Sequence, residues 1–383
     1  MTDLAAGAPD TSTEGPLPPG SGISEQDLAI IDALQAAPRA SWARIGQALD
    51  IDGTTAARRW ERLRSAGAAW ITAYGSARVA TVAFLEVRCR PRRLETIREA
   101  VARLPWVFSV DETAGEFDLM LSSAATDLPT LGRWVRDGIG ALRGVRAIRM
   151  RVGIDLYSEG GDWSMGAIPP AQRAHLATLR VPSRSAYGTR EFHRLAPADR
   201  ALMLALHADA RMSYTDLGAA AGMSEHTARR RLERLLRDGD VLMRCDFAYP
   251  LAGLRTMVMY RLSVPQTRQS VTATALARLP EVRLCAAVSG RHGLLVHVLL
   301  PGPGGIDPFE ELLAEQFPMV EIRDRAIVVR NVKRMGWLLD EQGRAIDRVP
   351  LMLSRRRTLI TQHRTSGRPT VAAATLPGVT PMN

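Results

Sequence analysis

The sequence predicts an α+β protein that contains two copies of one module, each with three short helices followed by strands and helices in the order β-α-β-β-α-β. The first observation behind this prediction is an internal repeat. Residues 23–71 align with residues 195–243 without a gap, and 17 of the 49 pairs are identical. Landmarks further along recur at an offset of 175 positions, as with Leu104-Pro105 and Leu279-Pro280. Because repeats on this scale set the architecture of a chain, we expect two large modules in tandem.

Composition and charge limit the class of protein. The chain has 383 residues, 46% of them apolar, which is ordinary for a globular protein of several domains. No segment approaches the ~18 apolar residues of a membrane span, and residues 1–21 lack the features of a signal peptide. Three widely spaced cysteines, Cys89, Cys245 and Cys285, fit free thiols in a reducing cytoplasm. The formal net charge of +10 permits nucleic-acid binding without requiring it.

The first copy opens with three predicted helices. Ser24 begins a capping box for the first helix, which ends near Pro38, and Ser41 is placed to cap the second. Asp52 is placed to cap a third helix that runs to about Ala66. Three short helices with a tight turn between the second and the third make a helix-turn-helix.

The second copy repeats this pattern with its own residues. Ser213 caps its second helix, Gly222-Met223-Ser224 forms the tight turn, and Gly239 ends the third helix. A short strand is expected after each third helix, completing a wing, at residues 70–72 and 241–243.

Behind each helical unit, the pattern changes to the order of the ferredoxin-like fold. Alternating apolar residues predict its strands, and a period of about 3.6 residues predicts its helices. In the first copy the strands are expected at 79–90, 106–113, 117–121 and 145–157, and the helices at 91–104 and 127–142. In the second copy the strands are expected at 257–264, 282–288, 294–300 and 320–332, and the helices at 271–279 and 308–316.

These patterns divide the chain into segments. They are a disordered N-terminus (1–22), a first winged helix-turn-helix (23–75), a first ferredoxin-like domain (76–157), a linker (158–194), a second winged helix-turn-helix (195–248), a second ferredoxin-like domain (249–340) and a basic disordered tail (341–383). The tail is basic because residues 348–383 hold six arginines and no acidic residue.

The third helix of each copy carries the candidate binding residues. Its buried face is predicted to be Ala56, Trp60 and Leu63 in the first copy, and Ala228, Leu232 and Leu235 in the second. Arginine presents a planar fork to guanine edges or phosphates, and threonine hydroxyls at a helix start reach phosphate oxygens. The predicted contacts to double-stranded DNA are Thr54, Thr55, Arg58, Arg59, Arg62, His226, Thr227, Arg230, Arg231 and Arg234.

The alternative for this arginine stripe is a solvated helix face, which the acids Glu61 and Glu233 on the same surface fit equally well. However, the outward arginines recur at the same register in both copies, and each set follows a tight turn behind a capped helix. These two features favour DNA binding over the solvated face.

Three motifs resemble those of the Lrp/AsnC family of bacterial transcription regulators, here duplicated in one chain. The stretch from Gly222 to Leu235 resembles the recognition helix of that family, Tyr249 to Gly253 resembles its connector, and Gly115 to Asp118 resembles a turn in its effector domain. The sequence departs from the family pattern at Asp52-Gly53, usually Ser-Pro, and at Trp60, usually a smaller aliphatic residue.

The resemblance implies a homo-oligomeric regulator whose C-terminal domains associate and bind an amino acid or a similar metabolite. By the same resemblance, Gly115, Asp118 and Gly290 are the effector-binding residues, and no metal or cofactor is implied. The stretch from Gly290 to Gly293 lacks the aspartate of the family turn. Asp118 also fits an ordinary surface turn, which the residues alone favour over a ligand contact.

An enzyme is the rival from another class, because sirohaem decarboxylases resemble this architecture and also occur as fused pairs. They carry a His-Asn-Tyr-x-Arg stretch on the second effector strand, which here reads 107–113 or 282–288 without such a set. His292 and His297 remain in the second copy, but neither phosphate-loop nor metal-ligand spacing occurs. The sequence therefore predicts that the protein is not an enzyme, which mixing it with haem precursors would test by absorbance.

A second rival is an architectural protein that coats DNA without defined operators. Arg355, Arg356 and Arg357 in the tail favour it, because such tails add sequence-independent phosphate contacts. A salt titration on operator and random DNA separates the two.

The duplication predicts that one chain imitates a dimer, with an internal pseudo-twofold axis. Single-copy relatives must dimerise to present two recognition helices about 34 Å apart. We expect the preferred DNA to be an imperfect palindrome with unlike halves, because the outward residues of the two copies differ. Two such chains are expected to associate as a homodimer that counts as four modules.

Overall fold

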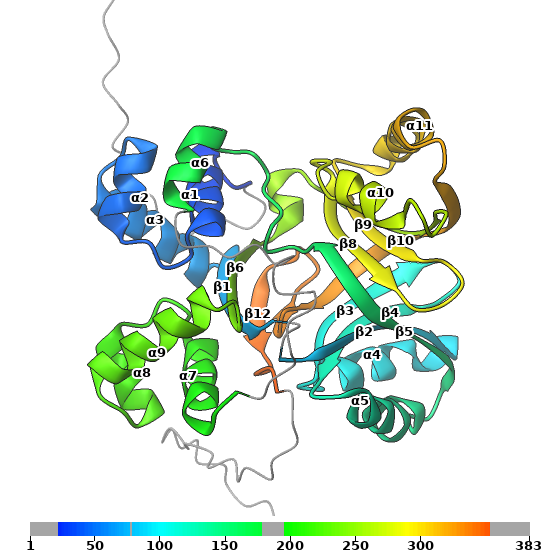
Figure 1. Ribbon diagram of the computed structural model, residues 1–383, viewed down its shortest axis with the longest axis horizontal. Coiled ribbons are helices and arrows are strands. Elements are labelled where there is room, and N and C mark those ends of the chain that lie inside the picture. Colours follow the sequence, from blue (N-terminus) through cyan, green and yellow to red (C-terminus); the bar gives the residue numbers. More distant parts are fainter. Residues whose placement is uncertain (1–21, 77–78, 178–194, 353–383) are drawn as a thin grey trace, which may run out of the picture.

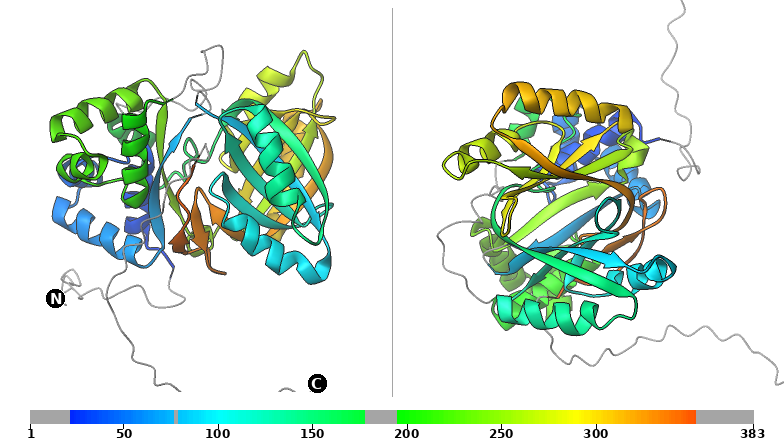
Figure 2. Two further views of the ribbon diagram at one scale, coloured as in Figure 1. Left: turned by 90° about the horizontal axis from the view of Figure 1, so that it is seen from below. Right: turned by 90° about the vertical axis from the view of Figure 1, so that its right-hand side faces the viewer.

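Two helical units lie side by side at one end of the molecule, and a β-barrel with helices on its outside forms the other end (Figures 1 and 2). The computed structural model describes residues 22–76, 79–177 and 195–352. Expectations for the N-terminus, the later part of the linker and most of the tail concern residues 1–21, 178–194 and 353–383, outside the described residues. The predicted α+β class, with two helix-turn-helix units each followed by a βαββαβ segment, is confirmed.

The first helix-turn-helix contains α1 (Glu25–Ala36), α2 (Trp42–Leu49) and α3 (Gly53–Ser65). Its predicted caps are confirmed, because the side chains of Ser24, Ser41 and Asp52 each accept backbone N–H groups of the helix that follows. Gly46 is needed where α2 meets the turn to α3. A Cβ atom at this position would lie 2.5 Å from the carbonyl oxygen of Ile51.

The second helix-turn-helix contains α7 (Pro197–Ala208), α8 (Tyr214–Ala221) and α9 (Glu225–Arg237). Ser213 and Ser224 cap α8 and α9 through their side chains. Gly222 ends α8 at a φ of 69°, a left-handed conformation that glycine adopts without steric cost. The predicted tight turn of the second copy is therefore confirmed.

The strand after each helix-turn-helix does not form the expected wing. Instead, β1 (Ala69–Gly75) pairs antiparallel with β6 (Val241–Phe247), so that the two copies share one two-stranded ribbon. Thr72 lies opposite Arg244 at its centre, and these two residues are equivalent positions of the repeat. The pseudo-twofold axis of the chain therefore passes between them.

The eight strands of the two effector domains close into one barrel. The first domain contributes β2 (Thr81–Cys89), β3 (Val107–Ala114), β4 (Leu119–Ala125) and β5 (Val145–Ser158). The second contributes β7 (Thr256–Ser263), β8 (Val282–Val288), β9 (Leu294–Leu300) and β10 (Glu321–Arg334). The outer helices are α4 (Leu94–Ala102), α5 (Leu128–Trp134), α10 (Gln269–Leu276) and α11 (Ile306–Gln316) (Figure 1).

The barrel closes by the same pairing made twice. β5 pairs with β8, with Gly153 opposite Val288, and β10 pairs with β3, with Val328 opposite Thr113. Each residue of the second pair lies 175 positions from its equivalent in the first. Both joins are therefore related by the pseudo-twofold axis, and the effector domains pair within one chain as the duplication predicted.

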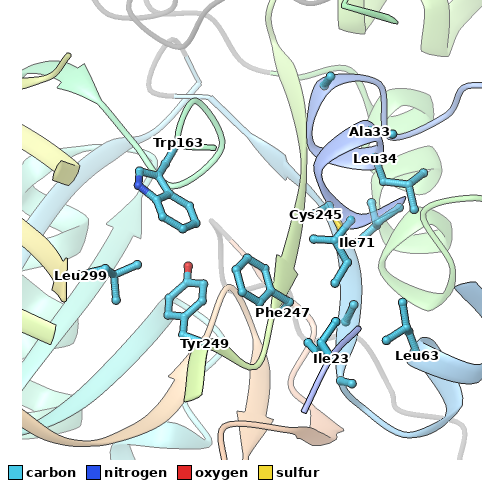
Figure 3. Packing of buried hydrophobic residues seen from close by; sticks show 14 of the residues in the cluster. Ile23, Ala33, Leu34, Leu63, Ile71, Trp163, Cys245, Phe247, Tyr249 and Leu299 are labelled. Carbon is cyan, nitrogen blue, oxygen red and sulfur yellow. The ribbon is translucent and has the colours of Figure 1, made fainter. Parts of the chain in front are cut away.

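Part of the predicted linker is an ordered element. It contains α6 (Pro170–Leu176), which packs on α1 and α2 (Figure 1). Upstream of α6, Trp163 is buried and stacks on Phe247 of β6 and against the edge of Tyr249 (Figure 3). Residues 158–177 therefore help to join the first helical unit to the barrel, because a large aromatic side chain is buried there.

The predicted start of the tail at residue 341 is wrong. β11 (Trp337–Leu339) and β12 (Ala345–Arg348) form a ribbon that extends from β10. The backbone N–H of Ala345 donates to the carbonyl oxygen of Gly67 over 2.8 Å, so the ribbon also touches the end of the first helix-turn-helix. Strand pairing and this contact order residues 341–352, which composition alone had assigned to the tail.

Candidate nucleic-acid interface

The two recognition helices, α3 and α9, have the buried faces that the helical wheel predicts. Ala56, Trp60 and Leu63 are buried in α3, and Ala228, Leu232 and Leu235 are buried in α9. The opposite faces carry the charged residues. Each helix therefore docks on its own helical unit through an apolar stripe and leaves the other side available for contact.

Arg58 and Arg230 are the clearest candidates for direct contact with a base or phosphate. They are equivalent residues of α3 and α9, and both are exposed. Within the described part of the chain, neither makes a recorded ion pair. Thr54 and His226, one helical turn earlier, are exposed as well, whereas Thr55 and Thr227 are half-buried. The structure thus places one unpaired arginine at the same position of each recognition helix.

The other four predicted arginines are tied to a buried acid in the first helix of their own unit. Arg59 and Arg62 contact Asp27 of α1 at 3.0 and 2.8 Å. In the equivalent arrangement of the second copy, Arg231 and Arg234 contact Asp199 of α7 at 2.9 and 2.8 Å. A charge buried in an apolar unit needs a counter-charge, and the long arginine side chains supply it.

The predicted outward orientation is therefore wrong for Arg62, whose side chain is only 14% exposed, while Arg234 remains 48% exposed. The residues that the sequence predicted for the DNA-binding surface do not include Asp27 and Asp199. The available signal was that this aspartate is identical in the two copies, within a stretch otherwise read as a cap and an apolar stripe.

Each recognition helix has one acid at its start, but at different positions. In α3, the Asp52 carboxylate accepts the backbone N–H groups of Thr54 and Thr55. Hydrogen bonds from the Thr54 hydroxyl and then from these N–H groups lower the pKa of Asp52, so it stays anionic. In α9 the equivalent position is the neutral Ser224, and the acid is the next residue, Glu225, whose carboxylate accepts the Thr215 hydroxyl at 2.8 Å. A DNA phosphate therefore meets a carboxylate at the cap of α3 and in the first turn of α9.

A reciprocal clasp holds the two helical units together. Arg39 donates to the carbonyl oxygens of Ala210 and Met212 at 2.6 and 2.8 Å. Arg211, its equivalent in the second copy, donates to those of Pro38 and Ala40 at 2.6 and 2.8 Å.

Each clasp arginine also lies over an aromatic ring of the other unit. Arg211 lies 4.0 Å from the ring centre of Trp42, and Arg39 lies 4.9 Å from that of Tyr214. Burial, and then the charge of Arg39, lower the pKa of Arg211 to about 10, so it stays cationic at neutral pH. The clasp and the β1–β6 ribbon together fix α3 and α9 as one pair.

The residues predicted to bind an effector lie at the far rim of the barrel. Asp118 accepts the backbone N–H of Cys89 through Oδ2 at 2.6 Å, which fits the turn-carboxylate interpretation. At Gly115, a Cβ atom would lie 2.8 Å from that of Ala326 in the other effector domain. Gly290, at a φ of 111°, lines a surface pocket. The pocket is formed by Glu116, Arg149, Met150, Arg151, Ser289, Gly290, Arg291 and His292.

A second, interior cavity of about 120 Å³ lies between the β1–β6 ribbon and the inside of the barrel. Its lining comes from both copies and includes His297 of β9, one of the two histidines noted in the sequence. In the described ranges, no cluster of three or more His, Cys, Asp or Glu side chains could hold a metal ion. Nor does any helix within those ranges have the length and apolar character to cross a membrane.

Comparisons with known proteins agree with this architecture. A family model for the AsnC-type helix-turn-helix domain matches residues 23–64 and 197–236, and one for the Lrp/AsnC ligand binding domain matches residues 82–161. An uncharacterised HTH-type transcriptional regulator of Pyrococcus horikoshii is 31% identical over 130 residues, which are 32% of this chain and 87% of the relative. Another from Pyrococcus abyssi is 26% identical over 147 residues, 38% of this chain and 91% of the relative.

Among solved structures, the siroheme decarboxylase NirDL in complex with an iron-uroporphyrin III analogue is similar, with a TM-score of 0.54. The match has 13% identity and covers 82% of this chain and 93% of that one, so it shows a shared tandem fold. The sequence relatives each match about one third of this chain, as expected if they correspond to one copy of the module. With its two matching helix-turn-helix units and its matching ligand-binding domain, the chain belongs to the Lrp/AsnC family of helix-turn-helix transcriptional regulators.

Proposed function

We propose that this protein is a sequence-specific DNA-binding regulator in which a single chain presents two recognition helices as a fixed pair. The observation that carries the proposal is the recurrence of Arg58 and Arg230, exposed and unpaired at the same register, on two units locked by the clasp. Single-copy regulators reach this arrangement by dimerisation, with half-sites about one helical turn apart. Here the ribbon and the barrel supply it within the chain.

The two halves of the preferred DNA site are unlike. The α3 surface presents Thr54 and Arg58 behind the cap residue Asp52, whereas the α9 surface presents His226 and Arg230 behind Ser224 and Glu225. Small-molecule control through the barrel, with an amino-acid-like effector near Gly290, is part of the proposal.

An enzymatic role like that of the siroheme decarboxylase is less well supported. A cavity of ~150 Å³ holds one benzene molecule, and the interior cavity here is about 120 Å³. A tetrapyrrole is several times larger than benzene, so it would need the ribbon and the barrel to separate. A shift in the absorbance of an added haem precursor, followed by loss of its carboxyl groups as CO₂, would favour the enzyme.

Replacing Arg230 by alanine is expected to weaken operator binding by about 1–3 kcal/mol and to relax the preference at one base position. Arg58→Ala should have the same kind of effect in the other half-site. The operator is first obtained by selection from random DNA, and binding is measured on operator and random duplexes at one salt concentration.

Arg278→Ala is the matched control, because Arg278 is an exposed arginine of the effector domain beyond α10. It should leave operator binding unchanged. If Arg58→Ala and Arg230→Ala lower affinity for operator and random DNA equally, then both residues contact only phosphates and the proposed base readout is wrong.

Removing the clasp with Arg39→Ala and Arg211→Ala together is expected to loosen the spacing requirement between half-sites. The wild-type chain should lose at least tenfold in affinity when about 5 bp, half a helical turn, are inserted between them. In the double variant this penalty should fall, because the two units then lose the clasp and keep the paired β1 and β6 as their link. An unchanged penalty in a folded double variant would show that the ribbon alone sets the spacing.

A further inference from the structure

We propose that the interior cavity is a binding site for a small carboxylic acid with an apolar body. This site is distinct from the surface pocket around Gly290, and the proposal does not depend on DNA recognition. It rests on the position of the cavity, its charge, an unpartnered histidine and its size.

The cavity lies on the pseudo-twofold axis, between the ribbon and the inside of the barrel. Tyr74, Leu242 and Arg244 line it from the ribbon, and Met203 lines it from α7 of the second helical unit. Its barrel side is built by both copies, and includes Phe84, Trp106, Phe108, Met257, Leu284 and His297. A molecule held there touches a helix-turn-helix unit, the ribbon and both effector domains.

Three buried guanidinium groups face this cavity, those of Arg244, Arg283 and Arg334. Arg244 and Arg283 share the Asp246 carboxylate, at 2.7 and 3.2 Å. Arg334 lies 3.9 Å from the ring centre of Tyr249 and donates to the carbonyl oxygen of Phe247 at 3.3 Å, and no carboxylate of the described residues lies within ion-pair distance of it.

The remaining ionisable groups at the cavity are the carboxyl groups of Asp111 and Glu159 and the amine of Lys333. Asp111 accepts a hydrogen bond from Asn331 at 2.6 Å, and burial raises the pKa of this carboxyl group. Glu159 accepts the hydroxyl of Tyr74. Lys333 donates to the carbonyl oxygen of Leu104, and burial, then the charge of Arg103, lower its pKa to about 7. Together with Asp246, these acids place three carboxyl groups against three guanidinium groups and one amine, so a ligand carboxylate would pair with the remaining positive charge.

His297 gives a second, independent sign of a ligand. It is 4% exposed, and its Nε2 atom has no hydrogen-bond partner among the described residues. Burial, then the charge of Arg283, lower its pKa to about 3, so the ring is neutral at physiological pH. Buried polar atoms are nearly always satisfied. A ligand oxygen in the cavity would accept a hydrogen bond from Nε2–H in the tautomer that carries the proton there.

The two copies of the module contribute unlike residues to the lining of the cavity. Its cationic and imidazole groups all come from the second copy: Arg244, Arg283, His297, Lys333 and Arg334. Their equivalents in the first copy are Thr72, Phe108, Ser122, Ser158 and Glu159, which include no cation. Two identical chains would place the same groups on both sides of the axis. This chain instead defines one orientation, with the carboxylate toward the second copy and the apolar body toward Phe84, Trp106 and Phe108.

Its volume limits the ligand to one ring or a short branched chain. The cavity, at about 120 Å³, is slightly smaller than the ~150 Å³ that accommodates benzene. Benzoate and isovalerate are therefore suitable probes, and benzamide is the neutral analogue of benzoate with nearly the same shape.

The test measures binding of these probes to the full-length protein without DNA, by calorimetry and by the shift in melting temperature. We expect benzoate or isovalerate to bind once per chain, and benzamide to bind at least tenfold more weakly than benzoate. Arg334→Met keeps the side-chain volume and leaves no carboxylate without its ion-pair partner. This substitution should lower the affinity for the acid at least tenfold. His297→Leu, which removes Nε2, should also lower the affinity for the acid, whereas Arg278→Met should leave it unchanged.

Because the benzoate–benzamide comparison needs no variant, the proposal can be tested even if a substitution prevents folding. Absence of saturable binding of both acids to the folded wild-type chain would overturn it. So would equal affinities of benzoate and benzamide, or unchanged affinity in folded Arg334→Met and His297→Leu proteins. Since the assay contains no DNA, failure here leaves the proposed DNA recognition untouched, and the operator assay reports on that separately.

Discussion

Replacing Glu86 by glutamine is expected to lower the free energy of unfolding by about 3–5 kcal/mol, because it leaves the buried Arg151 without its counter-charge and removes one of the three acids around Arg261. Glu86 is fully buried inside the barrel on β2. Its carboxylate accepts Arg151 at 3.0 Å and Arg261 at 2.6 Å, and both arginines are buried. Urea denaturation of the two proteins measures the difference, and the exposed Glu99 of α4, replaced by glutamine, is the control.

A double-mutant cycle tests whether Glu86 and Arg261 are energetically coupled. Arg261→Gln should cost less than Glu86→Gln, because Glu86 then keeps Arg151. Combining the two substitutions should cost less than the sum of the single effects, since their partners are in contact. Additive effects, or a loss below about 1 kcal/mol for Glu86→Gln, would show that water screens this cluster despite its burial.

The same ion pair explains why one copy prefers the other. Glu86 and Arg261 occupy equivalent positions of the repeat, 175 residues apart, and they meet on the pseudo-twofold axis. If two first copies paired instead, two glutamates would face each other, and two second copies would bring two arginines together. Like charges buried at this distance are strongly unfavourable. The divergence of the two copies therefore specifies pairing within the chain.

The second large effect is expected at Asp27, the fully buried acid of the first helical unit. Asp27→Ala should lower the free energy of unfolding by about 3–5 kcal/mol, because Arg59 and Arg62, 15% and 14% exposed, lose their ion pairs with the buried Asp27. Asp199→Ala should cost less, about 1–3 kcal/mol, since Arg231 and Arg234 are 34% and 48% exposed and water can solvate them.

Chemical denaturation of both variants checks the order of these two losses. Glu25→Ala is the control, because Glu25 is an exposed acid on the same helix as Asp27. Equal losses in the two copies would mean that the exposure of the arginines does not set the strength of the bridge. Stronger non-specific DNA binding by Asp27→Ala is expected as well, since the Asp27 carboxylate then no longer offsets the positive charges of Arg59 and Arg62.

The elements that the sequence predicted correctly are those set by local physics. A serine or aspartate cap acts on N–H groups two or three residues away, as at Ser24 and Asp52. The period of apolar residues decides which side of α3 and α9 is buried. The repeat, read from identities alone, determined that two equivalent halves would pair, and the barrel closes by two equivalent joins.

Tertiary structure decided where long side chains and free strand edges find their partners. A strand such as β1 can pair with any suitable edge, so nothing near Thr72 indicates Arg244 rather than a wing as its neighbour. Arg62 extends far enough to reach Asp27, 35 positions earlier, instead of pointing to DNA. The cavity collects Arg244, His297 and Arg334 from strands that are adjacent only after the barrel has closed. Charge and hydrogen-bond satisfaction are properties of the assembled interior, and they are fixed only when distant segments exclude water together.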